Sequence, residues 1–162
     1  MNKVFSKPIR IIVTAAVLVA AAVTAVVWPI VKKPELVLVN PDTGRAYIRF
    51  DVEEGTEFAV TFRHSVNKSD VTEIYEIRDG AVWLTGCVYY HFGAGVAEEL
   101  DPTWELTMGE NGEMIISSID MELPNLIYRV GTVYDHILTI GDERIVLNEL
   151  CGRNARVHFT VR

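Results

Sequence analysis

Two hydrophobic patterns divide the chain. Residues 11–31 form a run of 21 residues without a charged side chain, whereas the chain after Pro34 alternates apolar and polar residues in short runs. As a helix that rises about 1.5 Å per residue, the first run spans the roughly 30 Å hydrocarbon core of a bilayer. Alternation with a period of two, in runs rich in β-branched and aromatic residues, is typical of β-strands. The pattern predicts one transmembrane helix followed by an all-β domain.

The alternating part predicts about ten short strands, bounded by glycine, aspartate and asparagine. The expected strands cover residues 36–39, 46–52, 57–66, 71–78, 81–88, 104–108, 113–118, 127–131, 137–140, 144–147 and 155–161. No stretch after residue 33 keeps a helical period for long, which favours an antiparallel β-sandwich or a partly open barrel. We therefore expect residues 1–33 to hold a cytoplasmic N-terminus and a signal-anchor helix, and residues 34–162 to form an extracytoplasmic β domain.

Basic residues around the apolar run predict its orientation. Lys3, Lys7, Arg10 and the amino terminus precede the run, while Lys32 and Lys33 follow it. This bias favours a cytoplasmic N-terminus, and thus a single-pass protein of the cytoplasmic membrane with its C-terminal domain outside. A cleaved secretory signal is the alternative, because a basic start, an apolar stretch and small residues fit that pattern as well.

The acidic charge is concentrated in the β domain. Residues 34–162 contain all 22 acidic residues but 10 of the 15 basic ones, which gives them a net charge of −12. Such a charge repels nucleic-acid phosphates and anionic lipid headgroups. The composition argues against nucleic acid as a partner and leaves soluble, cationic or protein partners open.

Three turns predict how the strands pair. Asp79-Gly80 and Asn111-Gly112 are dipeptides favoured in two-residue hairpin loops, and residues 67–70 have the composition of a four-residue loop. Each loop length determines which residues face each other across the ladder.

This register would bring a histidine and a carboxylate together. His64 faces Glu73 on an otherwise apolar face, and the next hairpin places Gly86 opposite Glu73. One interpretation is a satisfied polar pair that fixes the register; the other is a small-ligand site with Gly86 as its floor. Ser65 points to the other face, and no nucleophile motif supports a hydrolase.

Two glycines and two cysteines are further candidates. Gly93 and Gly95 belong to a loop that forms either an anion-binding nest or a tight turn. Cys87 and Cys151 either form one disulfide in an oxidising compartment or remain free thiols. The four histidines lack the paired spacing of zinc ligands, so we predict no metal site and no cofactor.

The motif around these candidates resembles the DUF1850 family of bacterial and archaeal proteins. The similarity is carried by residues 62–66, by Lys68, Val71, Glu73 and Tyr75, and by residues 92–95. His64, Ser65, Glu73, Gly93 and Gly95 fall on the family's motif positions. Genes of this family often lie beside those of TRAP transporters of the TAXI type. The resemblance therefore implies an accessory role in solute uptake and assigns no reaction.

These observations favour a membrane-anchored binding or accessory module over an enzyme. Its expected partners are the cytoplasmic membrane, a TRAP permease or its solute-binding protein, and a small solute. An extracytoplasmic hydrolase that uses His64 and Glu73 as acid and base is one alternative. A purely structural envelope protein is the other.

Overall fold

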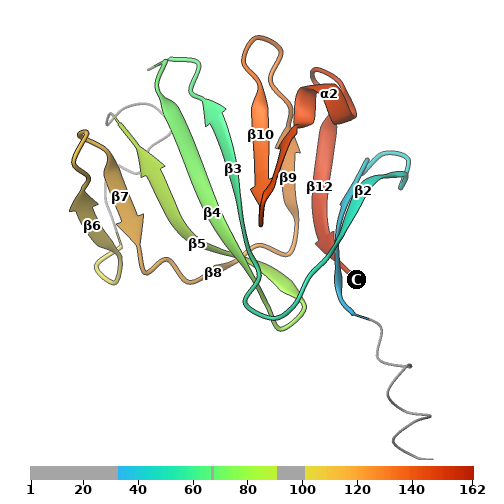
Figure 1. Ribbon diagram of the computed structural model, residues 1–162, viewed down its shortest axis with the longest axis horizontal. Helices are drawn as coiled ribbons and strands as arrows, with labels where there is room; N and C mark the ends of the chain where they lie inside the picture. The colour runs from blue at the N-terminus through green and yellow to red at the C-terminus, as the bar shows by residue number, and fades with distance from the viewer. Residues whose placement is uncertain (1–32, 67, 91–100) are drawn as a thin grey trace, which may run out of the picture. The chain divides into compact units, whose positions relative to one another are not determined.

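All strand pairs among the described residues are antiparallel, and they form two sheets (Figure 1). The computed structural model describes residues 33–66, 68–90 and 101–162. Sheet A has the order β2-β1-β12-β9. Its strands are β1 (Glu35–Val39), β2 (Ala46–Asp51), β9 (Leu126–Arg129) and β12 (Arg156–Val161).

Sheet B is the larger sheet and has the order β11-β10-β3-β4-β5-β7-β6, with β8 paired to β5. Its strands are β3 (Glu57–Arg63), β4 (Asp70–Arg78), β5 (Ala81–Tyr89), β6 (Glu105–Met108), β7 (Met114–Ser117), β8 (Met121–Glu122), β10 (His136–Ile140) and β11 (Glu143–Val146). One short helix, α2 (Leu147–Cys151), follows β11.

The two sheets share one hydrophobic core within the compact unit Pro34–Arg162. Leu36 from sheet A and Val60 and Leu138 from sheet B are fully buried in it. The rings of Phe58 and Phe159 stack across the two sheets, with centroids 5.7 Å apart and planes at 4°. A second cluster on sheet B contains Val71, Tyr89, Met114, Ile116 and Ile119.

The antiparallel all-β fold is confirmed, and the predicted strands coincide with the observed ones to within a few residues. The sequence missed β8 and α2, because two and five residues are too short to show a period. The predicted transmembrane helix at residues 11–31 lies outside the described residues. Among the residues that are described, no helix is long and apolar enough to cross a membrane.

Of the two predicted two-residue turns, one is confirmed and the other is wrong. Asp79-Gly80 is a two-residue loop between the paired Arg78 and Ala81, with φ of 50° and 72°, as a type I′ turn requires. The expected two-residue loop at Asn111-Gly112 is wrong, because the paired strand ends are Met108 and Met114.

The longer loop between β6 and β7 is held by a side chain. The Glu113 carboxylate accepts a hydrogen bond from the Asn111 backbone N–H at 2.8 Å, and Gly112 adopts φ 86°. This side-chain bond offers the backbone an alternative to the two-residue turn.

The predicted register of β3 and β4 is also wrong. Val60, not His64, lies opposite Glu73, because the loop spans residues 64–69 and not 67–70. Within it, the His64 N–H donates to the Ser69 carbonyl at 2.8 Å, and Lys68 adopts φ 53°. The register differs from the prediction by four residues, an even number, so the same side chains still face the core.

The predicted partner of Gly86 is wrong, because β5 contains a β-bulge. The β4–β5 register shifts between Ile74 and Tyr75, so that Gly86 pairs with Ile74 and Cys87 pairs with Glu73. Thr85 is the extra residue, and its hydroxyl donates to the Ile74 carbonyl at 3.3 Å. Gly86 is therefore not the floor beneath Glu73.

The observed register predicts a specific cross-link. In a background with Cys87→Ser and Cys151→Ser, the pair Thr61→Cys and Thr72→Cys should form a disulfide on mild oxidation, because the two threonine hydroxyl oxygens lie 2.9 Å apart. Mass spectrometry of the unreduced protein measures the bond. The pair Thr61→Cys and Glu76→Cys, which a four-residue loop would have placed opposite each other, should stay reduced. A disulfide in that control pair alone would contradict the register.

Candidate functional site

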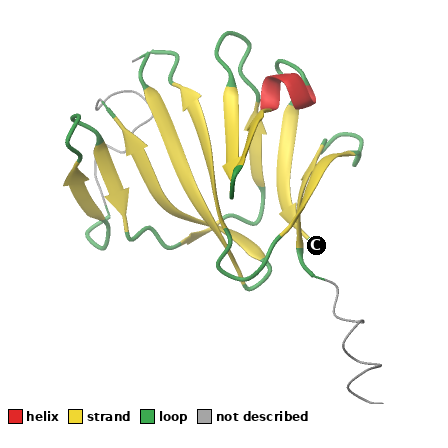
Figure 2. Ribbon diagram, viewed as in Figure 1, coloured by secondary structure: helices red, strands yellow, loops and turns green. Residues whose placement is uncertain are grey.

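An open pocket of about 490 Å³ lies where the β3–β4 and β9–β10 loops meet. Both loops belong to the end of the domain that carries α2 (Figure 2). The pocket is lined by Phe62, Arg63, His64, Ser65, Gly131, Thr132, Val133, Tyr134 and His136. Its size falls within the roughly 300–1,000 Å³ that is usual for small-molecule sites.

Aromatic rings form much of the pocket wall. Phe62 at the end of β3 and His136 at the start of β10 stack with ring centroids 5.1 Å apart and planes at 10°. The Arg63 guanidinium lies over the Tyr134 ring, 5.4 Å from its centroid. This cation–π contact holds a positive charge at the edge of the pocket.

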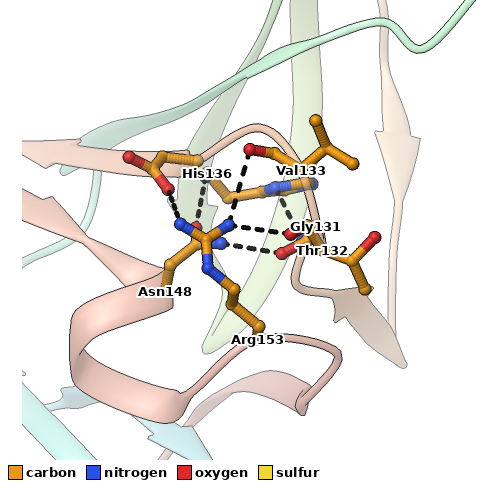
Figure 3. Close-up of polar contacts among 7 residues, drawn as sticks. Gly131, Thr132, Val133, His136, Asn148 and Arg153 are labelled. Carbon is orange, nitrogen blue, oxygen red and sulfur yellow. Dashed lines mark hydrogen bonds and ion pairs between the residues drawn. The ribbon is translucent and has the colours of Figure 1, made fainter.

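The wall formed by the β9–β10 loop is fixed by Asn148 from α2 (Figure 3). The Asn148 amide nitrogen donates to the Gly131 carbonyl at 2.7 Å, and its oxygen accepts from the His136 backbone N–H at 2.8 Å. Asn148 is 8 % exposed, so both bonds are shielded from water. One buried side chain thus joins the beginning and the end of the loop.

Arg153 adds a second, more exposed set of bonds to the same loop (Figure 3). Its guanidinium donates to the Thr132 carbonyl at 3.0 Å and pairs with Asp135 at 3.3 Å. Because these groups are about half exposed, they contribute less to stability than the Asn148 bonds.

His136 is held as a neutral ring at the base of the pocket. Its Nδ1 accepts a hydrogen bond from the Gly131 N–H at 3.1 Å, so the neutral ring carries its proton on Nε2. Burial lowers the pKa of His136, while the Tyr134 carbonyl and the charge of Glu73 oppose that shift. The pocket therefore contains an uncharged imidazole at neutral pH.

Glu73 lies deeper, in a cluster with two tyrosines that joins the sheets. The Tyr75 hydroxyl donates to Glu73 Oε2 at 2.9 Å, and the Tyr128 hydroxyl from β9 donates to the same oxygen. The two hydroxyl oxygens lie 2.5 Å apart. Burial, the nearby Glu73 charge and, for Tyr128, the neighbouring Tyr75 raise the pKa of both phenols, so both stay protonated as donors.

The candidates from the sequence have separate places in the structure. His64 and Ser65 line the same pocket, because both lie in the β3–β4 loop and not on alternating strand positions. Glu73 belongs to the tyrosine cluster, and Gly86 packs with the β7 backbone, where an added Cβ would lie 3.1 Å from the Ile116 carbonyl oxygen. Gly93 and Gly95 lie outside the described residues.

Both cysteines are free thiols, so of the two alternatives the structure has the free thiols and not the disulfide. Cys87 packs with the second hydrophobic cluster, whereas Cys151 at the end of α2 packs against the main core. Burial, with a smaller effect of the Glu73 charge, raises the pKa of the Cys87 thiol to about 12. No group of three His, Cys, Asp or Glu side chains in the described part of the chain is arranged to hold a metal ion.

Most residues of the site were not among the candidates from the sequence, including Tyr128, His136, Asn148 and Arg153. These four lie 50 or more residues after the end of β4, and no spacing rule connects them to the β3–β4 loop. The one available signal was Asn148, a polar residue between apolar Leu147 and the acidic Glu149, immediately after a predicted strand.

Comparison with known proteins identifies one family. The model of a family described as "Domain of unknown function (DUF1850)" matches residues 58–147, from β3 to the first residue of α2. This range includes all nine pocket residues and the Glu73 cluster. No curated protein and no solved structure matches the chain.

Removing one phenol should destabilise the domain in a pH-dependent way. Tyr128→Phe leaves the half-buried Glu73 carboxylate with one of its two phenol donors, so we expect the free energy of unfolding at pH 7 to fall by about 1–3 kcal/mol. The folded-state pKa of Tyr128 is raised above its unfolded value, so its contribution is present below about pH 10 and is lost at higher pH. Urea unfolding of both proteins from pH 7 to pH 11 measures this, and the two curves should converge at the alkaline end. A constant difference would show that the phenol does not titrate as argued.

Removing the Asn148 side chain should release the pocket wall. Asn148→Ala leaves the Gly131 carbonyl and the His136 N–H without their partner, so we expect a loss of about 2–4 kcal/mol of stability in urea unfolding. Arg153→Ala is the matched control on the same loop and should cost about 1 kcal/mol or less. Equal losses for the two variants would show that Asn148 does not hold the loop.

Proposed function

The chain belongs to the DUF1850 family, and we propose that it is a membrane-anchored, extracytoplasmic binding module whose pocket between the β3–β4 and β9–β10 loops holds a small solute. The observation that carries the proposal is the combination of an open pocket with a wall fixed by buried hydrogen bonds. A pocket that is already formed loses little entropy when a ligand binds.

The contacts of Asn148 support binding over a purely structural role. Its amide uses both its donor and its acceptor to fix a loop whose residues 132 and 133 are exposed. Val133 is 74 % exposed beside the pocket. The buried amide thus holds in one position a loop whose own side chains remain accessible at the pocket.

The hydrolase alternative has less support. It required His64 and Glu73 to lie opposite each other, and the register of β3 and β4 places Val60 there. The Glu73 oxygen Oε2 also accepts hydrogen bonds from two phenols that remain protonated.

The site and the apolar run together favour a module that acts close to a membrane. The uncharged residues 11–31 supply the proposed anchor, and Pro34, the third residue after this run, begins the β domain. With the resemblance to DUF1850, this supports an accessory role beside a TRAP uptake system of the TAXI type, in which the pocket would hold solute near the permease.

A ligand screen with a pocket-filling variant tests the proposal. Full-length protein, which we expect to sediment with membranes, is purified in nanodiscs and screened by thermal shift against a panel of anionic, cationic and neutral small solutes. Ser65→Trp fills the pocket, and Thr139→Trp on the exposed side of β10 is the matched control. We expect at least one solute to raise the melting temperature of the wild type and of Thr139→Trp but not of Ser65→Trp. If no solute does so, the binding function is wrong.

A further inference from the structure

We infer that this pocket selects a small organic anion, in which a carboxylate is attached to a flat or branched apolar body. The inference rests on the proposed function and adds the class of solute. It follows from three observations: the charge of the lining, the position of Arg63 and the shape of the apolar surfaces.

The lining of the pocket differs in charge from the rest of the domain. None of its nine residues is acidic, although residues 34–162 carry a net charge of −12. A second pocket, of about 630 Å³, is lined by Asp51, Asp142 and Glu143 together with Arg49. The pocket at the β3–β4 loop therefore lacks the carboxylates that would attract a cationic solute and repel an anionic one.

Arg63 supplies a positive group that is available to a ligand. Asp70 lies directly across the ladder, yet no ion pair involving Arg63 is found among the described residues. Asp135, on the loop that forms the opposite wall, is paired with Arg153. The guanidinium instead lies over the Tyr134 ring, 5.4 Å from its centroid, a cation–π contact that leaves its N–H groups available to bind a carboxylate.

The other surfaces of the pocket suit an apolar body. Phe62 and the neutral His136 present stacked rings, and Tyr134 presents a third ring beneath Arg63. Val133 adds an exposed branched side chain at the edge. Ser65 and Thr132 provide hydroxyl groups that can donate to a second carboxylate oxygen.

The negative net charge of the domain does not prevent an anion from binding in this pocket. At physiological ionic strength, charges more than about 8 Å apart in solvent are largely screened. Direct contact with Arg63 within the pocket therefore outweighs the distant carboxylates, which mainly slow the approach of an anion, and Asp70 across the ladder is a nearer carboxylate with a small opposing effect.

Four matched probes separate charge from shape. Benzoate has the carboxylate and a flat body, benzamide is its neutral counterpart, benzylammonium is a cation of similar shape, and acetate lacks the body. Binding to the full-length protein in nanodiscs is measured by isothermal titration, and Ser65→Trp corrects for partition into lipid. We expect benzoate to bind about tenfold or more tightly than benzamide, because a charged hydrogen bond is lost in the amide. Acetate and benzylammonium should bind more weakly than benzoate.

Three variants test the role of Arg63. Arg63→Gln should weaken benzoate binding about tenfold and leave benzamide binding nearly unchanged. Asp70→Asn removes the carboxylate across the ladder and should strengthen benzoate binding about twofold. Arg144→Gln, an exposed arginine on β11 outside the pocket, makes the same change in net charge and should have little effect.

The outcomes distinguish this inference from the proposed function. If benzamide or benzylammonium binds as tightly as benzoate, or if Arg63→Gln and Arg144→Gln have equal effects, the selection of an anion is wrong while a binding function stands. If no probe binds but other solutes in the thermal-shift panel do, the inference is again wrong and the binding function again stands. An empty panel overturns both.

Discussion

The position of Glu73 between two phenols is the constraint on which the rest of the domain depends. A half-buried carboxylate inside an apolar core is costly unless it is hydrogen-bonded, and here the donors come from both sheets: Tyr75 from sheet B and Tyr128 from sheet A. Tyr128 is held on β9, two residues before Val130, which is fully buried. The loop that forms one wall of the pocket begins at the next residue, Gly131. The polar cluster in the core thus determines where the pocket wall starts, and Asn148 determines where it ends.

Polar contacts such as those of Glu73 select the register of β3 and β4, which the hydrophobic pattern alone does not determine. Shifting β3 against β4 by an even number of residues keeps every apolar side chain on the core face, so packing alone distinguishes such registers weakly. Phe62 pairs with Val71 in the structure and would have paired with Tyr75 in the expected register, and both pairs are apolar. The sequence therefore predicted the faces of these strands correctly and their partners incorrectly. Specific polar contacts, among them the Thr61–Thr72 hydroxyl pair, distinguish the observed register.

The strands were predictable because each is a local feature, whereas the site depends on contacts between distant segments. His64 and Ser65 were recognised as candidates, and both line the pocket, but through a loop and not through the pairing with Glu73 that was expected. His136 could not be found in this way, and Asn148 stood out only as a polar residue immediately after a predicted strand. Their roles depend on how β10 and α2 are placed against the β3–β4 loop, and no periodicity or spacing in one sequence encodes that placement.

The bulge at Thr85 shifts the alternation of inward and outward side chains along β5 by one residue. Before it, Val82 and Leu84 face the core, and after it, Cys87 and Tyr89 do. Deleting Thr85 would remove the bulge and leave a regular ladder, in which Leu84 still pairs with Tyr75 and Cys87 still pairs with Glu73, so that Tyr89 stays buried. In the rest of a paired strand, a single insertion or deletion shifts every later side chain to the wrong face. Descendants of this gene can thus lose the Thr85 codon without turning any core residue of β5 outward, whereas the loss of a neighbouring paired residue would reverse the strand.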